Sequence, residues 1–339
     1  MALYIPTIPM PDLAVQEQAR ERQLQLVKPT GALGVLEGLS VRLAAMTGQL
    51  MLSFPRKSVV VMAADHGVAA EGVSAYPAEV TQQMVLTMAN GGAAVNVLAR
   101  QAGATVTLVD IGVAADLPKH PQINSYKVAY GTRNMAAGPA LTLQEVSDAI
   151  MVGMNVASQE IAQGVDLLAI GEMGIGNTTA AAAITAVILD LPPLEVTGRG
   201  TGIDDERLTD KIRIIEQAIA LNQPDPRDAL DVLRCVGGLE IAGMAGVILG
   251  AAAGRVPVVV DGFIASTAAL VASELAFQVR PYLIAGHKSM EQGHSAILRR
   301  LGLRPLLDLD MRLGEGSGAV LAFHLIEAAA RTLNEMMTF

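Results

Sequence analysis

The hydrophobic positions of this chain form two kinds of run, one short and continuous, the other longer with helical spacing. The short runs are typical of strands buried on both faces, and they cover residues 58–64, 105–109, 167–170, 256–260 and 282–285. The longer runs predict helices over residues 78–89, 93–102, 143–163, 180–189, 205–221, 239–253 and 266–277. Their alternation predicts βαβ units and therefore an α/β fold built on a parallel sheet.

The two ends of the chain have no strand-like run. Helices are predicted there instead, over residues 13–26, 36–46 and 318–337. We expect them to pack together as a small helical domain made of residues 1–50 and 311–339. The large α/β domain, which contains the active-site crevice, then spans residues 51–310.

Polar residues and glycines follow each of the five predicted strands. The segments are Asp65-His66-Gly67, Asp110-Ile111-Gly112, Gly171-Glu172-Met173-Gly174, Asp261-Gly262 and Gly286-His287. In open α/β sheets the ligand crevice lies outside the carboxyl ends of the strands, so we expect these segments to gather there. Taken alone, each acid is as consistent with capping the next helix or fixing a loop as with a place in a ligand site.

Two glycine-rich segments, residues 171–179 and 197–205, each precede a predicted helix. Exposed N–H groups, threonine hydroxyls and a helix start are typical of a phosphate site, although neither the Walker loop nor Gly-x-Gly-x-x-Gly is matched. Lys211, about two turns into the second helix, can hold a phosphate as a point charge. The alternatives are a tight turn without a ligand and an ordinary surface lysine.

One carboxylate lies among three glycines near the C-terminus. Glu315 stands between Gly314 and Gly316, shortly before Gly318 and an apolar helix. Glycines let a backbone approach a ligand closely, and the following helix offers unpaired N–H groups and a positive dipole end. Glu315 is therefore a candidate to contact a small molecule, with a solvated helix-starting turn as the alternative.

Two further segments contain side chains that can bind a ligand. In residues 74–83, where a helix begins after a proline turn, Tyr76 can stack on a heterocycle and Gln82 can hydrogen-bond one of its nitrogens; a solvated first turn is the alternative. His287 and His294 have the side-chain type of metal ligands, but their spacing matches no zinc signature. We therefore expect no metal site.

The composition narrows the class of protein. Of 339 residues, 51% are hydrophobic and 17% are charged, which is typical of a globular chain with a large core. A net charge of −9 argues against a nucleic-acid partner. The single cysteine, Cys235, excludes an intramolecular disulfide and is expected to be buried. With no signal-peptide pattern and no apolar segment long enough to span a bilayer, we expect a cytoplasmic protein.

Taken together, the motifs resemble one family: nicotinate-nucleotide:dimethylbenzimidazole phosphoribosyltransferase, which prepares the lower ligand of cobalamin. The resemblance covers nearly the whole chain. The motifs that resemble the family are Lys28-Pro29 with Gly31 and Leu33-Gly34, and residues 64–68, 171–179, 198–202, 287–294 and 312–316. The chain departs from the family pattern at Thr30 and Ala32, where proline and serine are expected, and at Ser317, which replaces a threonine.

The resemblance implies a homodimer with a Rossmann-like parallel sheet flanked by helices and a small helical domain formed by both chain termini. It implies that nicotinate mononucleotide and 5,6-dimethylbenzimidazole give α-ribazole 5′-phosphate and nicotinate, with inversion at C1′. Glu315 matches the proposed general base, and Glu172 is expected to stabilise positive charge on the ribose. Because the pyridinium of the mononucleotide can leave without protonation or a metal, we expect no cofactor.

The expected substrate contacts, from the motifs and the resemblance together, form two groups. The nucleotide and phosphate group consists of Gly174, Ile175, Gly176, Asn177, Thr178, Gly200, Gly202, Lys211, Ser289 and Gly316. The benzimidazole group consists of Ser74, Tyr76, Gln82 and Leu313. Two other functions stay open: a magnesium-dependent transferase that uses pyrophosphorylated ribose, and a nucleotide-binding regulatory module without catalysis.

Overall fold

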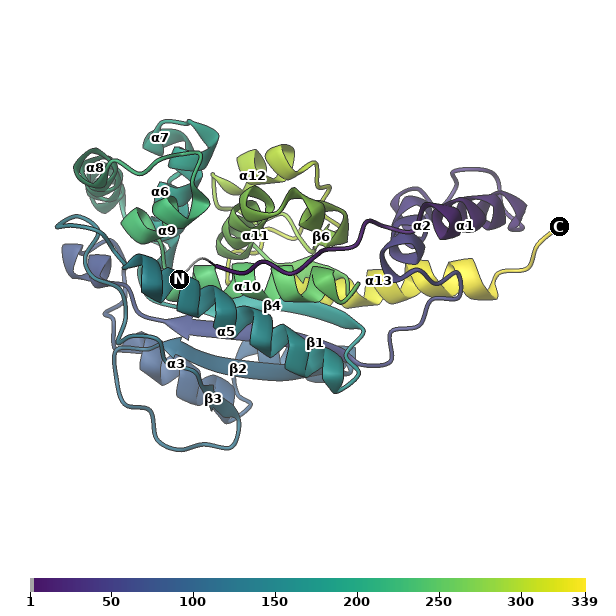
Figure 1. Cartoon of the computed structure of the whole chain (residues 1–339), viewed down its shortest axis with the longest axis horizontal. Helices are drawn as coiled ribbons and strands as arrows, with labels where there is room; N and C mark the ends of the chain where they lie inside the picture. Colours follow the sequence, from purple (N-terminus) through teal and green to yellow (C-terminus); the bar gives the residue numbers. More distant parts are fainter. Residues whose placement is uncertain (1–2) are drawn as a thin grey trace.

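A six-stranded parallel sheet forms the centre of the computed structural model, which describes residues 3–339. Its order is β3-β2-β1-β4-β5-β6, and every neighbouring pair is parallel. The strands are β1 (Lys57–Ala64), β2 (Ala104–Gly112), β3 (Ile123–Ser125), β4 (Leu167–Met173), β5 (Val258–Val260) and β6 (Leu283–Ala285). Helices flank this sheet, so the predicted α/β fold is confirmed (Figure 1).

The sequence pattern predicted five of these strands and missed β3. Strand β1 is buried along its whole length, as its continuous apolar run predicted. Strand β3 has only three residues, none of them buried, and it lies at the edge of the sheet. A short exposed edge strand has no hydrophobic pattern that distinguishes it from a loop.

The predicted helices are all present with small shifts at their ends. They are α3 (Val80–Ala89), α4 (Ala94–Ala102), α5 (Leu143–Ala162), α6 (Asn177–Leu189), α8 (Asp205–Asn222), α10 (Leu239–Ala253) and α11 (Phe263–Leu275). The pattern missed the α-helices α7 (Pro193–Val196), α9 (Ala229–Val236) and α12 (His294–Leu301), and the 3₁₀ helices η1 (Gly67–Glu71) and η2 (Phe277–Tyr282). These segments are too short to show a clear helical period.

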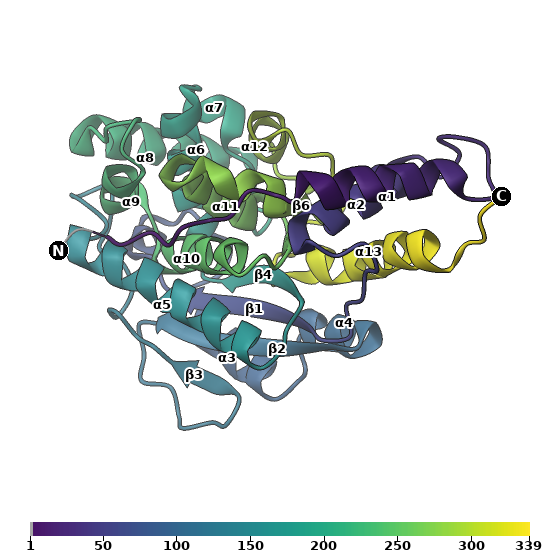
Figure 2. The same cartoon turned by 45° about the vertical axis from the view of Figure 1, so that its right-hand side comes forward.

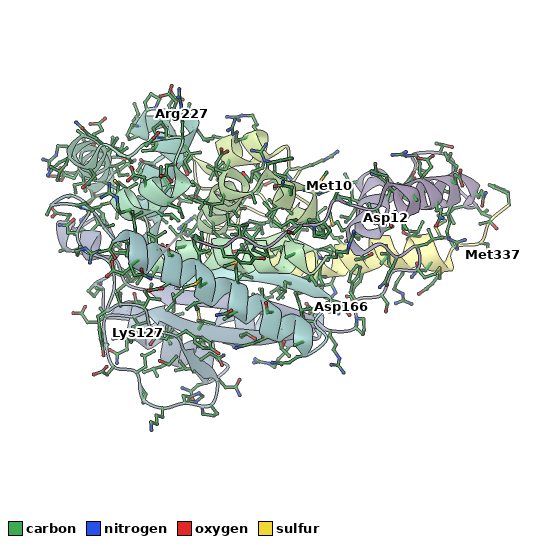
Figure 3. All side chains as sticks on the ribbon, viewed as in Figure 1. Met10, Asp12, Lys127, Asp166, Arg227 and Met337 are labelled. Carbon is green, nitrogen blue, oxygen red and sulfur yellow. The ribbon has the colours of Figure 1, made fainter. Side chains whose placement is uncertain are left out.

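The helices at the two chain ends pack together at one end of the molecule. They are α1 (Leu13–Gln25), α2 (Val35–Thr47) and α13 (Ser317–Glu335). Arg22 of α1 donates to the carbonyl oxygens of Leu333 and Asn334 in α13, at 2.6 and 2.9 Å. Figures 1 and 2 show these helices beside the sheet, and Figure 3 shows Asp12 and Met337 at this end of the molecule. The predicted contact between the two chain ends is therefore confirmed.

Two details qualify the predicted division of the chain. Helix α13 also packs against α4, β4 and β5, so its first turns belong to the body around the sheet. The segment before α1 runs along that body as well, where the hydroxyl of Tyr282 donates to the carbonyl oxygen of Pro9 at 2.8 Å (Figure 2). The domain limits near residues 50 and 311 stay a prediction. Within residues 3–339, none of the helices combines the length and the apolarity needed to cross a membrane.

The polar segments predicted to gather at one edge of the sheet do so. Parallel register pairs Met62 of β1 with Glu172 of β4, and Ile170 of β4 with Val260 of β5. The residues that follow these strands, including Asp65 and Asp261, therefore lie at the same edge. This edge is the carboxyl end of the sheet, where α/β folds form ligand crevices.

Candidate active site

A cavity of about 730 Å³ opens at the carboxyl edge of the sheet. Its size lies within the range of small-molecule sites. Ten of the expected site residues line it: Tyr76, Glu172, Gly174, Ile175, Asn177, Thr178, Gly200, Ser289, Leu313 and Glu315. The cavity thus brings together segments from both glycine-rich loops, the turn before α13 and the loop before α3.

The remaining expected residues lie next to this wall and do not line it. Gly316, Gly176 and Gly202 are turn residues with φ of 89°, 94° and 99°. The hydroxyl of Ser74 lies 3.1 Å from that of Thr201, which does line the cavity. Gln82 is half-buried on α3, the helix that contributes Val80 and Met84 to the wall.

Three structural elements hold Glu315 and its turn in place. Its Oε2 accepts a hydrogen bond from the N–H of Val95 in α4 at 3.1 Å. Asp261, after β5, accepts from the N–H groups of Gly316 at 3.2 Å and Ala319 at 2.9 Å. A Cβ at Gly171 of β4 would overlap the backbone of Glu315 and Gly316, so the absence of a side chain there lets the turn sit against the strand.

The backbone of this turn is strained at the acid itself. Glu315 has φ of 64°, between Gly314 at 86° and Gly316 at 89°. A non-glycine residue in the left-handed region costs about 1–2 kcal/mol, and such strain is frequent at functional sites. Glu315 is only 5% exposed, so the turn that starts α13 is not the solvated turn of the alternative interpretation.

Burial changes the protonation of the acids in the cavity. Loss of solvent raises the pKa of Glu315, although the Val95 N–H opposes this rise. For Glu172 the rise is larger, to about 8, because desolvation acts together with the negative charges of Glu240 and Asp261. Asn177 partly opposes it by donating to Oε2 of Glu172. In the free protein at neutral pH, Glu172 is therefore mostly protonated.

Another part of the cavity wall, the donor-rich end, contains several hydrogen-bond donors. Thr178, in the first turn of α6, and Gly200, in the second glycine-rich segment, both line it. Behind them the ammonium of Lys211 donates to Oγ1 of Thr178 at 2.9 Å and to the carbonyl oxygen of Gly198 at 3.3 Å. Lys211 is 1% exposed, and desolvation lowers its pKa to about 8. The alternative of an ordinary surface lysine is therefore wrong.

Comparison with known proteins identifies the family. Residues 8–339 match a family model described as "Phosphoribosyltransferase". The nicotinate-nucleotide–dimethylbenzimidazole phosphoribosyltransferase of Chloroflexus aggregans is 59% identical, over 100% of this chain and 97% of its own length. The crystal structure of the Thermus thermophilus protein of the same name superposes with a TM-score of 0.92 at 50% identity, covering 97% of each chain. This chain belongs to the nicotinate-nucleotide–dimethylbenzimidazole phosphoribosyltransferase family. The predicted family is confirmed.

Several cavity residues were not predicted as site residues of this phosphoribosyltransferase. Asp261 was noted only as a residue that follows a strand, and His287 only as such a residue, as part of a family motif and as a metal-ligand type without a matching spacing. Both line the cavity, with His287 Nε2 3.4 Å from Asp261 Oδ1. Glu291 was not singled out at all. The apolar wall formed by residues 263–265 carried no signal, because apolar residues at the start of a helix are typical of a core.

His294 and the single cysteine, Cys235, are both buried in the structure. Within residues 3–339, no group of three or more His, Cys, Asp or Glu side chains is arranged to hold a metal ion. His294 instead accepts the N–H of Ser289 at Nδ1, at 2.9 Å, and lies 2.9 Å from the hydroxyl of Ser266 through Nε2. His294 therefore positions the Ser289 segment of the cavity wall. Cys235 is buried, as predicted.

Proposed function

We propose that this chain transfers the phosphoribosyl group of nicotinate mononucleotide to 5,6-dimethylbenzimidazole, giving α-ribazole 5′-phosphate and nicotinate. Membership of the family supports the substrates. The observation that carries the mechanism is the buried carboxylate of Glu315, held by the Val95 N–H on the wall of the cavity. Its raised pKa makes it a stronger base than an exposed glutamate while it is ionised.

In the proposed reaction, a benzimidazole nitrogen attacks C1′ of the ribose as the bond from C1′ to the pyridinium nitrogen breaks. The bonding electrons go to the nicotinate ring, which leaves uncharged at nitrogen. Attack from the opposite face inverts the β configuration to α. The second ring nitrogen of the benzimidazole then becomes acidic and loses its proton to Glu315. A positioned general base of this kind typically contributes about 10²–10⁴-fold to the rate.

Glu172 acts on the ribose in this proposal. Positive charge develops at C1′ as the transition state loosens, and a nearby carboxylate stabilises it. The pKa of Glu172 is about 8 in the free protein. The cationic pyridinium of the bound mononucleotide lowers that pKa, since opposite charges favour the ionised acid. Binding of the first substrate thus prepares Glu172 for its role.

We assign two other parts of the cavity wall to the 5′-phosphate of the mononucleotide and to the benzimidazole. The 5′-phosphate binds at the donor-rich end, beside Thr178, Gly200 and Ser289, with the charge of Lys211 behind them. The benzimidazole lies against Tyr76, Leu313 and the apolar residues Val80 and Met84 of α3. Ser74 and Gln82 lie beside this wall, within the segment that can hydrogen-bond the base.

A direct assay tests this function and its alternatives. The protein is incubated with nicotinate mononucleotide and dimethylbenzimidazole, with and without chelator, and the product anomer is identified by NMR. We expect α-ribazole 5′-phosphate and free nicotinate at the same rate in both reactions. A rate that disappears with chelator favours a magnesium-dependent transferase. Binding of both substrates without release of nicotinate favours a regulatory module.

We further propose that the protein is a cytoplasmic homodimer, as the family resemblance and the composition led us to expect. Large apolar side chains are exposed at its helical end, including Leu24, Val27 and Phe339. Exposed apolar surface of this kind is typical of an interface. Sedimentation equilibrium measures the mass directly, and a monomer at micromolar concentration contradicts the proposal.

A further inference from the structure

Glu291 lies in the donor-rich end of the cavity, although it carries a negative charge. It precedes α12, lines the cavity and is 9% exposed. Its Oε1 accepts a hydrogen bond from the N–H of Gly200 at 3.0 Å. A Cβ at Gly198 would overlap the Glu291 carboxylate, so the glycine there leaves space for it. The carboxylate of Glu291 therefore packs against the second glycine-rich segment and is hydrogen-bonded to it.

The surroundings of Glu291 are those of an anion site. Lys211 contacts the same turn through the carbonyl oxygen of Gly198 at 3.3 Å, and its ammonium is buried. The charge of Glu291 partly opposes the desolvation of Lys211, so the two side chains interact electrostatically. The N–H of Gly200 and the ammonium of Lys211 thus already interact with an anion of the protein itself, the carboxylate of Glu291.

The hydrogen bonding of Glu291 is incomplete. Its second oxygen, Oε2, is buried, and the described residues provide no hydrogen-bond partner for it. A buried carboxylate oxygen without a partner is unfavourable. A phosphate has three terminal oxygens and accepts charge-assisted hydrogen bonds from several donors at once. The site is therefore better satisfied by a phosphate than by the side chain that occupies it.

We propose that Glu291 is a resident anion of the phosphate subsite, whose carboxylate holds the N–H of Gly200 until the 5′-phosphate of the mononucleotide replaces it. This inference rests on the proposed function, which places the phosphate at this end. Glu291 then determines specificity, because only a ligand with a phosphate compensates for the lost hydrogen bond from Gly200 to Glu291 and for the lost attraction between Glu291 and Lys211. A nucleoside without phosphate leaves Glu291 where it is.

The substitution Glu291→Gln tests this role in a binding measurement. Glutamine has nearly the same shape, but its neutral oxygen is a weaker acceptor for the Gly200 N–H and leaves Lys211 without a counter-charge. We expect calorimetry to show nicotinate mononucleotide bound about tenfold more tightly than by the wild type, with nicotinate riboside unchanged. Glu206→Gln is the matched control, because it removes the same charge from an exposed position in the first turn of α8.

Two results would overturn the inference. If Glu291→Gln binds both ligands more weakly, Glu291 only supports the conformation of the glycine turn. If wild type and variant bind nicotinate mononucleotide with equal affinity, Glu291 does not take part in phosphate binding. If the variant does not fold, a crystal structure of the wild type with nicotinate mononucleotide decides the question. There Glu291 should have left the Gly200 N–H, and a Glu291 still bonded to it contradicts the inference. Failure of the wild type to bind the mononucleotide at all contradicts the proposed function instead.

Discussion

Two parts of the cavity wall differ in the charge of their groups, and in both parts these groups are buried. One end contains the carboxylates of Glu172, Asp261 and Glu315. The other contains hydrogen-bond donors, including the N–H of Gly200, which donates to the carboxylate of Glu291, with the ammonium of Lys211 behind them. Burial raises the pKa of Glu172 and Glu315 and lowers that of Lys211. At both ends, burial therefore favours the uncharged form of groups that the proposed function needs charged.

This difference matches the proposed substrate. Nicotinate mononucleotide carries a positive pyridinium nitrogen at C1′ of the ribose, with the nicotinate carboxylate on the far side of that ring, and a negative phosphate at the 5′ end. Each charge favours the ionised form of the groups it meets, Glu172 in one case and Lys211 in the other. In the free protein, burial thus favours the uncharged forms of Glu172 and Lys211. The bound ligand supplies the opposite charges that favour their ionised forms. The following substitutions separate the contributions of the two ends.

The largest effect is expected at the acidic end, from Glu315→Gln. The amide cannot take the benzimidazole proton, so we expect turnover to fall by at least about 10²-fold while nicotinate mononucleotide still binds. Steady-state kinetics and calorimetry on the same preparation measure the two quantities. Full activity in this variant removes Glu315 as the general base.

A methyl group added at position 171, where β4 packs against the turn of Glu315, should also slow the reaction. In Gly171→Ala the new Cβ overlaps the backbone of Glu315 and Gly316, so the turn must move away from β4. Because small displacements of a catalytic group are costly, we expect kcat to fall by about 10- to 100-fold. Gly138→Ala, where the added Cβ has no neighbour within 4 Å, serves as the control. An unchanged kcat in Gly171→Ala would show that the position of the turn is not critical.

The pH dependence of stability tests the protonation of Glu172. Folding raises its pKa from 4.5 to about 8, so the protonated form is favoured in the folded state. Its contribution to stability is complete below pH 4.5 and is lost as the pH rises through about 8. Between pH 5 and 8 we expect wild type to lose on the order of 3 kcal/mol relative to Glu172→Gln. Parallel stability curves from urea unfolding contradict the raised pKa.

The smallest effect is expected at the donor-rich end, from Lys211→Ala. Loss of the buried ammonium should weaken nicotinate mononucleotide binding about tenfold and leave nicotinate riboside unchanged. Lys288→Ala removes the same charge from an exposed ion pair with Asp308 and provides the comparison. Equal losses for the two ligands exclude an electrostatic contribution to phosphate binding.

The accuracy of the sequence-based predictions differed between the fold and the site. The limits of α10 were predicted without error, because its long apolar run begins after two glycines and ends before another. Helix α11 was predicted from residue 266 but begins at Phe263, since residues 263–265 are all apolar and by themselves show no helical period. The glycine neighbours of Glu315 were enough to predict it as a candidate site residue. Nothing near Glu291 in the chain indicated that it would meet Gly200.

The sequence by itself determined the local features: which segments become strands and helices, where glycines permit a left-handed turn, and which acids follow strands. These depend on neighbours within a few residues, so periodicity and turn chemistry reveal them. The tertiary structure decided which groups meet, such as Val95 with Glu315 and Gly200 with Glu291. It also decided their protonation, because a pKa depends on burial and on charges brought close by the fold, not on the order of residues.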